Sequence, residues 1–246
     1  MKYIKLPDYT ERKTSINMII IHCFALSVSQ MINTLKSSKL STHYIIGPRG
    51  GIIRCVPDSK QAWHAGKSFW NGAENLNQNS IGIEICSPSL GQNKYHPAQI
   101  KSLCCLCKKL IKKYNIPVSN IVGHSDIAPT RKTDPGFAFP WKKLSSAKIG
   151  LWYNLEDSLK INTRDINKLL SLIGYDTKDL PTTLASAYAF CRHFLPQFVT
   201  ADQDISHLIE NPLTQDFSFT KNEIFINTLK AVAYTYCKAS NKPCKI

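Results

Sequence analysis

The sequence has 246 residues and a formal net charge of +14, from 31 Lys and Arg against 17 Asp and Glu. With 43% hydrophobic and 20% charged residues, it has the composition of a globular protein with a substantial core. This composition excludes a disordered chain, a collagen-like chain and a disulfide-stabilised miniprotein. The positive charge favours a polyanionic partner without choosing between nucleic acid, an acidic membrane face and an acidic polymer. No apolar run approaches the ~20 residues that span a bilayer, so we expect no transmembrane segment.

The first part of the chain predicts alternating strands and helices. The apolar run at residues 18–21 is typical of a strand buried on both faces. Residues 42–47 and 51–56 predict two strands joined by a tight turn. In the strand predicted over residues 80–86, Glu84 lies on the face opposite three isoleucines, because side chains alternate between the two faces of a strand.

Residues 97–114 predict an amphipathic helix. Its apolar side chains recur at intervals of three and four residues, which is the spacing of one helix face. Its cysteines lack the spacing of metal ligands, so we interpret them as reduced thiols in the core. The lysines of this helix lie off the apolar stripe and are expected to face solvent: Lys101, Lys108, Lys109, Lys112 and Lys113.

Later in the chain the pattern becomes entirely helical. Thr163 is expected to cap a helix that stops at Gly174. A second apolar stripe covers residues 184–195. The capping box Thr220-x-x-Glu223 then predicts a third helix.

These patterns divide the chain into two parts. Residues 1–155 predict an α/β fold with a central mixed β-sheet flanked by helices. Residues 156–246 predict a small all-α domain, within which the polar stretch at 198–218 has no assignable pattern.

Three residues stand out as candidate metal ligands. His22 ends a buried strand, where a polar ring has no structural reason to lie unless something binds it. His124 lies in a short loop, and Asp134 follows ten residues later. Two imidazoles and one carboxylate form a three-ligand zinc set that leaves a fourth position for water. The spacing alone is unspecific, because such residues occur by chance in many proteins.

A series of ordered sequence blocks makes the pattern specific. They are Met18-Ile-Ile-Ile-His22, Thr42-His-Tyr-Ile-Ile-Gly-Pro-Arg-Gly-Gly-Ile-Ile53, Ala62-Trp-His-Ala-Gly66, Asn79-Ser-Ile-Gly-Ile-Glu84, Tyr95-His-Pro-Ala-Gln99, Gly123-His-Ser-Asp-Ile-Ala-Pro129, Arg131-Lys-Thr-Asp-Pro-Gly136 and Phe139-Pro-Trp141. Over residues 15–153 the chain resembles the zinc-dependent N-acetylmuramoyl-L-alanine amidases of the type 2, AmpD-like family. Within that family it is most similar to the bacterial members that carry a C-terminal helical domain.

The resemblance implies a role for each matching residue. His22, His124 and Asp134 would hold one zinc ion per chain, with Glu84 as the catalytic carboxylate and Lys132 as the catalytic lysine. Peptidoglycan recognition proteins and phage lysozymes on the same fold usually have a cysteine as the third ligand, so Asp134 points to the bacterial amidases. The implied reaction cuts the amide between the lactyl group of N-acetylmuramic acid and L-alanine of the stem peptide in peptidoglycan or muropeptides.

The chemistry of these residues agrees with the implied reaction. Zinc on three protein ligands lowers the pKa of bound water to ~7. Glu84 projects away from the core and can take the proton of that water and pass it to the leaving amine. Lys132 is two residues from Asp134 and can present an ammonium to the developing oxyanion. The non-catalytic alternatives are a salt bridge at the sheet edge for Glu84 and a solvated surface position for Lys132.

Residues of the predicted strands and loops around the metal are candidate substrate contacts. An exposed aromatic ring in the loop at 62–66 can stack on a sugar or peptide, and arginines can meet the carboxylates of an acidic stem peptide. The candidates are His43, Tyr44, Arg54, Trp63, His64 and Arg131.

Three other functions are alternatives to the zinc amidase. A non-catalytic muropeptide-binding module on the same fold would need neither Glu84 nor Lys132. A nucleic-acid-binding protein would interleave its basic residues with aromatics, which this chain does not, so no nucleic-acid partner is expected. An additional serine-type peptidase activity would use Ser145-x-x-Lys148 or Ser218-x-x-Lys221, but two such matches are what chance predicts for this content of serine and lysine.

The sequence leaves two alternatives open for the compartment and two for the role of the helical part. The amino terminus lacks the apolar segment of a signal peptide, and an odd number of cysteines, nine, favours the reducing cytoplasm. The additional helical domain instead favours the periplasm or cell envelope. Residues 167–176 faintly resemble a peptidoglycan-binding domain, and a structural or partner-binding role is equally consistent. The oligomeric state and the choice between polymeric, soluble and anhydro substrates are not determined by the sequence.

Overall fold

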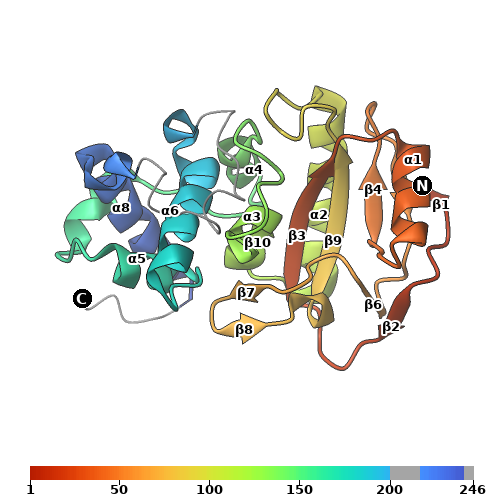
Figure 1. Ribbon diagram of the computed structural model, residues 1–246, viewed down its shortest axis with the longest axis horizontal. Helices are drawn as coiled ribbons and strands as arrows, with labels where there is room; N and C mark the ends of the chain where they lie inside the picture. Colours follow the sequence, from red (N-terminus) through yellow and green to blue (C-terminus); the bar gives the residue numbers. More distant parts are fainter. Residues whose placement is uncertain (200–216, 241–246) are drawn as a thin grey trace.

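The computed structural model of the chain describes residues 1–199 and 217–240 (Figure 1). Its centre is a six-stranded sheet with the strand order β1-β5-β4-β9-β3-β10. The neighbouring strands are parallel except for the antiparallel pair β4–β5, so the sheet is mixed, as predicted. The strands are β1 (Lys2–Tyr3), β3 (Met18–Phe24), β4 (Tyr44–Ile46), β5 (Ile52–Arg54), β9 (Ser80–Cys86) and β10 (Ile121–Gly123).

Smaller strand pairs and helices surround this sheet. The two-stranded sheets are β2 (Tyr9–Glu11) with β6 (Lys60–Ala62), and β7 (Phe69–Trp70) with β8 (Ala73–Glu74). The α-helices are α1 (Val28–Ser37), α2 (Pro97–Tyr114), α3 (His124–Ile127), α4 (Trp141–Ser146), α5 (Ile166–Ile173), α6 (Leu180–Phe194) and α8 (Glu223–Ala239). Short 3-10 helices are η1 (Leu76–Gln78), η2 (Val118–Asn120), η3 (Leu155–Lys160), η4 (Pro196–Phe198) and η6 (Ser218–Lys221).

Strands β3 and β9 at the centre of the sheet are buried along their whole lengths. Because side chains alternate along a strand, one face carries the isoleucines that pack against the apolar stripe of α2. The predicted position of Glu84 on the other face is thereby confirmed. His22 lies directly opposite Glu84 in the register of the two strands, so both side chains project from this second face.

Helix α2 has the bounds that its periodicity predicts, and its ends have clear physical causes. Pro97 occupies the first turn, where its missing N–H costs nothing, and the His96 ring accepts the Ala98 N–H as an N-cap. Asn115 ends the helix in the left-handed conformation, with φ of 52°.

The caps predicted for two later helices were wrong. Helix α5 is capped by Asp165, which accepts the Lys168 N–H, and Thr163 lies further upstream. Helix α8 is capped by Asn222 and begins at Glu223, so the expected capping box does not form. In both cases an Asx side chain closer to the helix provides the acceptor.

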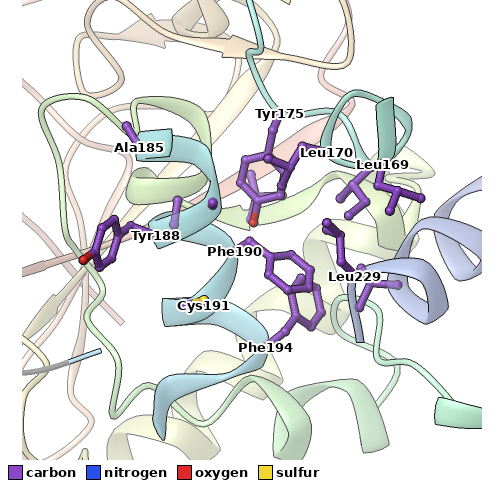
Figure 2. Close-up of a cluster of buried hydrophobic side chains, with 14 of the residues drawn as sticks. Leu169, Leu170, Tyr175, Ala185, Tyr188, Phe190, Cys191, Phe194 and Leu229 are labelled. Atoms are coloured by element: carbon purple, nitrogen blue, oxygen red, sulfur yellow. The ribbon is translucent and has the colours of Figure 1, made fainter. Parts of the chain in front are cut away.

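The C-terminal helices pack onto the sheet and do not stand apart from it. One hydrophobic cluster contains Met18 and Ile20 of β3 and Val122 of β10 together with the apolar faces of α5, α6 and α8. Figure 2 shows Tyr175, Phe190 and neighbouring side chains filling the space between these helices. The helical character of this part is confirmed, whereas a domain boundary at residue 155 stays a prediction. The polar stretch at 198–218 falls largely outside the described residues.

None of the helices among the described residues combines the length and apolar character of a membrane-spanning segment. The lysines expected on the solvent side of α2 are exposed, which agrees with the amphipathic pattern.

We expect Leu170→Ala to lower the free energy of unfolding by about 2–5 kcal/mol, because it opens a cavity in the core that the helices share with the sheet. Leu159→Ala is the matched control: this leucine is 81% exposed, and its truncation should change the free energy by about 0.5 kcal/mol or less. Urea unfolding followed by circular dichroism measures both. Equal effects of the two substitutions would contradict the shared core.

Candidate metal site

Three side chains from separate parts of the chain meet at one edge of the sheet. His22 is in β3, and His124 begins α3 directly after β10, the strand that pairs with β3. Asp134 lies in the loop that follows α3. The Nδ1 atoms of the two histidines are 2.9 Å apart, and Asp134 Oδ2 lies 3.4 Å from His22 Nδ1 and 3.2 Å from His124 Nδ1. These positions group the three predicted ligands within 4.8 Å of one another.

A chain of hydrogen bonds fixes which nitrogen of His22 carries the proton. The Ser80 hydroxyl donates to the Leu76 carbonyl, so Ser80 Oγ is the acceptor for His64 Nε2–H at 3.3 Å. His64 Nδ1 is therefore the acceptor for His22 Nε2–H at 3.0 Å. Burial and, after it, the neighbouring His124 lower the pKa of His22 to about 4, against an opposing effect of Asp134. The ring is thus neutral at pH 7, and its Nδ1 presents a lone pair to the site.

The second histidine is oriented in the same way. His124 Nε2 lies 3.2 Å from the carbonyl oxygen of Ala65, which can only accept, so Nε2 carries the proton. The His124 Nδ1 atom then points toward His22 and Asp134. Burial raises the pKa of the Asp134 carboxyl, but the charge and the hydrogen bonds that the imidazoles of His124 and His22 supply when protonated hold it far below its ordinary value, so Asp134 is ionised.

Three electron-pair donor atoms therefore converge on one point. Such an arrangement is repulsive unless a cation, either a proton or a metal ion, lies among the three atoms. Tetrahedral zinc sites have ligand bonds of ~2.0–2.2 Å, which separates the ligand atoms by about 3.3–3.6 Å, close to the distances observed here. Two neutral imidazoles and a carboxylate are also a common donor set for a divalent metal. The described residues of this site fit a metal ion.

Glu84 is beside this group and is almost entirely buried. Its Oε2 has no hydrogen-bond partner among the described residues. Burial, the nearby Asp134 carboxylate and the opposing Lys132 ammonium together raise the pKa of Glu84 to about 8, with burial the largest cause. A carboxyl with a pKa near neutrality can both accept and release a proton at physiological pH.

Lys132 is on the loop that carries Asp134. Its backbone N–H donates to the Ala128 carbonyl at 3.0 Å, which ties the loop to the end of α3. Its charge lowers the pKa of both His22 and Glu84, so the ammonium faces the same site. The structure therefore brings together all five residues to which the sequence assigned metal binding or catalysis.

Comparison with known proteins identifies the group to which this site belongs. Residues 12–137 match the family described as Amidase_2, N-acetylmuramoyl-L-alanine amidase. N-acetylmuramoyl-L-alanine amidase AmiD of Escherichia coli (strain K12) is 34% identical over 216 residues, which are 77% of this chain and 78% of that protein. The chain belongs to the N-acetylmuramoyl-L-alanine amidase family.

Two further relatives support this assignment. The 1,6-anhydro-N-acetylmuramyl-L-alanine amidase AmpD of Enterobacter cloacae is 44% identical over 104 residues, 42% of this chain and 54% of that protein. A solved structure of AmiD from E. coli, described as a complex with the substrate anhydro-N-acetylmuramic acid-L-Ala-D-gamma-Glu-L-Lys, has a TM-score of 0.73 and 27% identity. That similarity covers 96% of this chain and 99% of the AmiD chain, so it includes the C-terminal helices.

The loop at 62–67 lies next to the site, and hydrogen bonds from two directions hold it in place. Asn77 Oδ1 accepts the backbone N–H groups of His64 and Ala65 at 3.0 and 2.7 Å. Arg131 donates to the carbonyls of Ala65 and Lys67. Sequence analysis did not identify Asn77, because a single asparagine in a polar stretch gives no signal of its contacts.

Of the candidate substrate contacts, three lie at this loop. Trp63 is 41% exposed and remains a candidate for stacking on the substrate. Arg131 uses its guanidinium to hold the loop carbonyls. His64 lies behind His22 and fixes its tautomer, a placement that the sequence did not predict. Substrate contact by these three residues stays a prediction.

The other three candidates lie in or next to strands β4 and β5. His43 is fully buried, with Nδ1 accepting the Gly82 N–H at 3.0 Å, Nε2 facing the Lys60 carbonyl and its ring edge-on to His64 with centroids 5.6 Å apart. Tyr44 and Arg54 contact Asp58, with the Tyr44 hydroxyl donating at 2.6 Å. Tyr44 projects from the opposite face of the sheet, which packs on α2. Substrate contact by His43, Tyr44 and Arg54 stays a prediction.

The Ser-x-x-Lys patterns do not assemble a serine-enzyme site among the residues described. Ser145 donates its hydroxyl to the Lys142 carbonyl within α4, at 2.8 Å. Lys148 is exposed, and Lys221 ends the short helix η6 that begins at Ser218.

We expect Gly82→Ala to weaken zinc binding by about 10- to 100-fold, the usual cost of disturbing the groups behind a metal ligand. A Cβ at Gly82 would lie 2.5 Å from His64 Cγ and push that ring away from His22. Gly51→Ala is the control, since a Cβ there meets nothing within 4 Å. Competition with a chromophoric chelator measures both affinities. Wild-type affinity in folded Gly82→Ala would contradict the role of His64.

Proposed function

We propose that this chain is a zinc-dependent amidase that hydrolyses the bond between the lactyl group of N-acetylmuramic acid and L-alanine of the stem peptide. Membership of the amidase family supports the reaction. The observation that carries the metal is the convergence of three ligand atoms within 4.8 Å of one another, from His22, His124 and Asp134. When bound there, zinc supplies Lewis-acid chemistry, which makes water a nucleophile at neutral pH and polarises the scissile carbonyl.

Glu84 moves the protons of the reaction. Its unpaired Oε2 accepts a proton from the attacking water, and the resulting carboxylic acid then gives that proton to the leaving amine of L-alanine. Burial suits the side chain to both steps, because it brings the pKa of Glu84 to about 8. Its location opposite His22 in the strand register keeps the proton acceptor next to the metal ligands.

Lys132 supplies a positive charge that stays in place during the reaction. The amide carbonyl oxygen gains negative charge as water adds to the carbon, and the ammonium of Lys132 stabilises that charge. Its shared loop with Asp134 places it on the metal side of Glu84. A non-catalytic muropeptide-binding module would have no use for a buried carboxyl without a hydrogen-bond partner, because such a group destabilises the fold.

Anhydro-muropeptides are the proposed substrate class. The similar AmiD structure is described as a complex with an anhydro-N-acetylmuramic acid tripeptide, and its similarity covers nearly the whole of this chain. Trp63 and Arg131 at the mouth of the site would then face the sugar and the acidic peptide. Residues 1–155 form the catalytic domain in this proposal, and residues 156–246 the helical domain.

The cytoplasm is the proposed compartment. Reduced thiols persist there, whereas paired cysteines are usual in oxidising compartments. The thiols among the described residues that support it are Cys23, Cys55, Cys86, Cys104, Cys105, Cys107 and Cys191.

We expect purified protein to release free peptide from an anhydro-muramoyl tripeptide, to lose this activity on treatment with a zinc chelator and to regain it when zinc is restored. The reason is that activation of water as a nucleophile at neutral pH depends on the bound metal. Mass spectrometry of the released peptide is the measurement. Undiminished cleavage in protein shown by elemental analysis to be metal-free would refute the proposal.

We expect Glu84→Gln to lower kcat by about 10²- to 10⁴-fold, because the amide cannot take up the proton of water. Zinc content should stay at one ion per chain, since the side chain keeps its size and donates nothing to the ligand set. His22→Ala is the contrasting variant and should lose both zinc and activity. Near-wild-type turnover by Glu84→Gln would exclude Glu84 as the proton carrier.

A further inference from the structure

Asp126, two residues after His124, is a buried carboxylate with three hydrogen-bond donors. It is 1% exposed. Its Oδ2 accepts the Gly123 backbone N–H at 2.7 Å and His193 Nδ1–H at 2.9 Å, and its Oδ1 accepts the Tyr175 hydroxyl at 2.7 Å. Because a buried carboxylate without partners is strongly unfavourable, these three donors determine where Asp126 lies.

Two of the three donors belong to the C-terminal helices. Tyr175 follows α5 and packs its ring edge-on against Trp70, with centroids 5.1 Å apart. His193 is near the end of α6, where its ring is stacked on Trp141 at 4.0 Å and on Phe194 at 4.1 Å. These ring contacts leave each donor little freedom to turn away from Asp126.

The acceptor side of the cluster is part of the metal-binding loops. Gly123 and Asp126 bracket His124, so their hydrogen bond closes the backbone turn from which the His124 ring projects. The next residue, Ser125, donates its backbone N–H to the Asp134 carbonyl at 2.8 Å. A shift of Asp126 would therefore move the backbone of two of the three metal ligands.

We propose that Asp126, Tyr175 and His193 form a positioning cluster, through which the C-terminal helices hold His124 and Asp134 in the geometry that binds the metal. The inference rests on the proposed metal site, and it gives the helical part a role inside the catalytic centre. Tyr175 and His193 are positioning residues, since neither contacts the metal ligands directly. Among the described residues, these two hydrogen bonds are the side-chain links from the C-terminal helices to Asp126 in the turn that carries His124.

The test is the zinc affinity of the full chain carrying Tyr175→Phe and His193→Leu, singly and together, measured by competition with a chromophoric chelator. Each single variant should bind zinc about 10-fold more weakly and the double variant up to about 100-fold, as for groups that orient metal ligands. The visible spectrum of the cobalt-substituted protein should change as well, since it reports coordination geometry. Tyr236→Phe, in the same core, is the matched control and should retain wild-type affinity.

A further variant separates hydrogen bonding from packing. His193→Asn keeps an N–H donor near the Nδ1 position but loses the stacked ring, so it should bind zinc more tightly than His193→Leu. Equal losses in the two variants would overturn the proposal, as would a folded double variant with wild-type affinity and an unchanged cobalt spectrum. Tyr175→Phe keeps the ring and the fold, so the test does not depend on the double variant folding.

Failure of this inference is distinguishable from failure of the proposed function. If wild-type protein binds zinc and His22→Ala does not, the metal site stands, and an unaffected double variant refutes only the positioning cluster. If wild-type protein binds no zinc, the proposed function and this inference are both refuted.

Discussion

The convergence of three electron-pair donor atoms on one point is the constraint around which the rest of this structure is arranged. Nδ1 of His22, Nδ1 of His124 and a carboxylate oxygen of Asp134 repel one another unless a cation lies between them. Fixed hydrogen bonds prevent the rings from escaping that repulsion: His64 holds the far nitrogen of His22, and the Ala65 carbonyl holds that of His124. Preorganisation of this kind costs folding free energy, which the surrounding core offsets.

Strand pairing, packing and hydrogen bonding each help to hold the three donor atoms together. Parallel pairing of β3 with β9 and β10 brings His22, Glu84 and the backbone turn of His124 to the same end of the sheet. Because Gly82 has no Cβ, the His64 ring fits against the strand behind His22. The C-terminal helices contribute through Asp126, whose carboxylate joins α6 to the turn that presents His124. A hydrophobic core common to the sheet and these helices makes that connection stiff.

Sequence patterns predicted the features that depend on neighbours along the chain. Alternation in the strand at 80–86 placed Glu84 opposite the isoleucines, since a strand has a period of two. Periodicity in the helix at 97–114 gave its bounds. Local patterns were less successful for helix caps, where Asp165 and Asn222 are used in place of the predicted threonines. Here several candidate acceptors lie within a few residues, and tertiary packing selects one of them.

By itself the sequence determined the fold class and the family, and it selected five candidate site residues, because each is embedded in a recognisable block whose order along the chain is specific. These are His22, Glu84, His124, Lys132 and Asp134. Only the tertiary structure decided what lies behind them. It placed His64 against His22 and His43 against His64, joined Tyr44 to Asp58 on the opposite face of the sheet, and connected Asp126 to Tyr175 and His193. These contacts join residues 14 to 67 positions apart, and no local pattern encodes such pairings, since they depend on which strands and helices come to lie side by side.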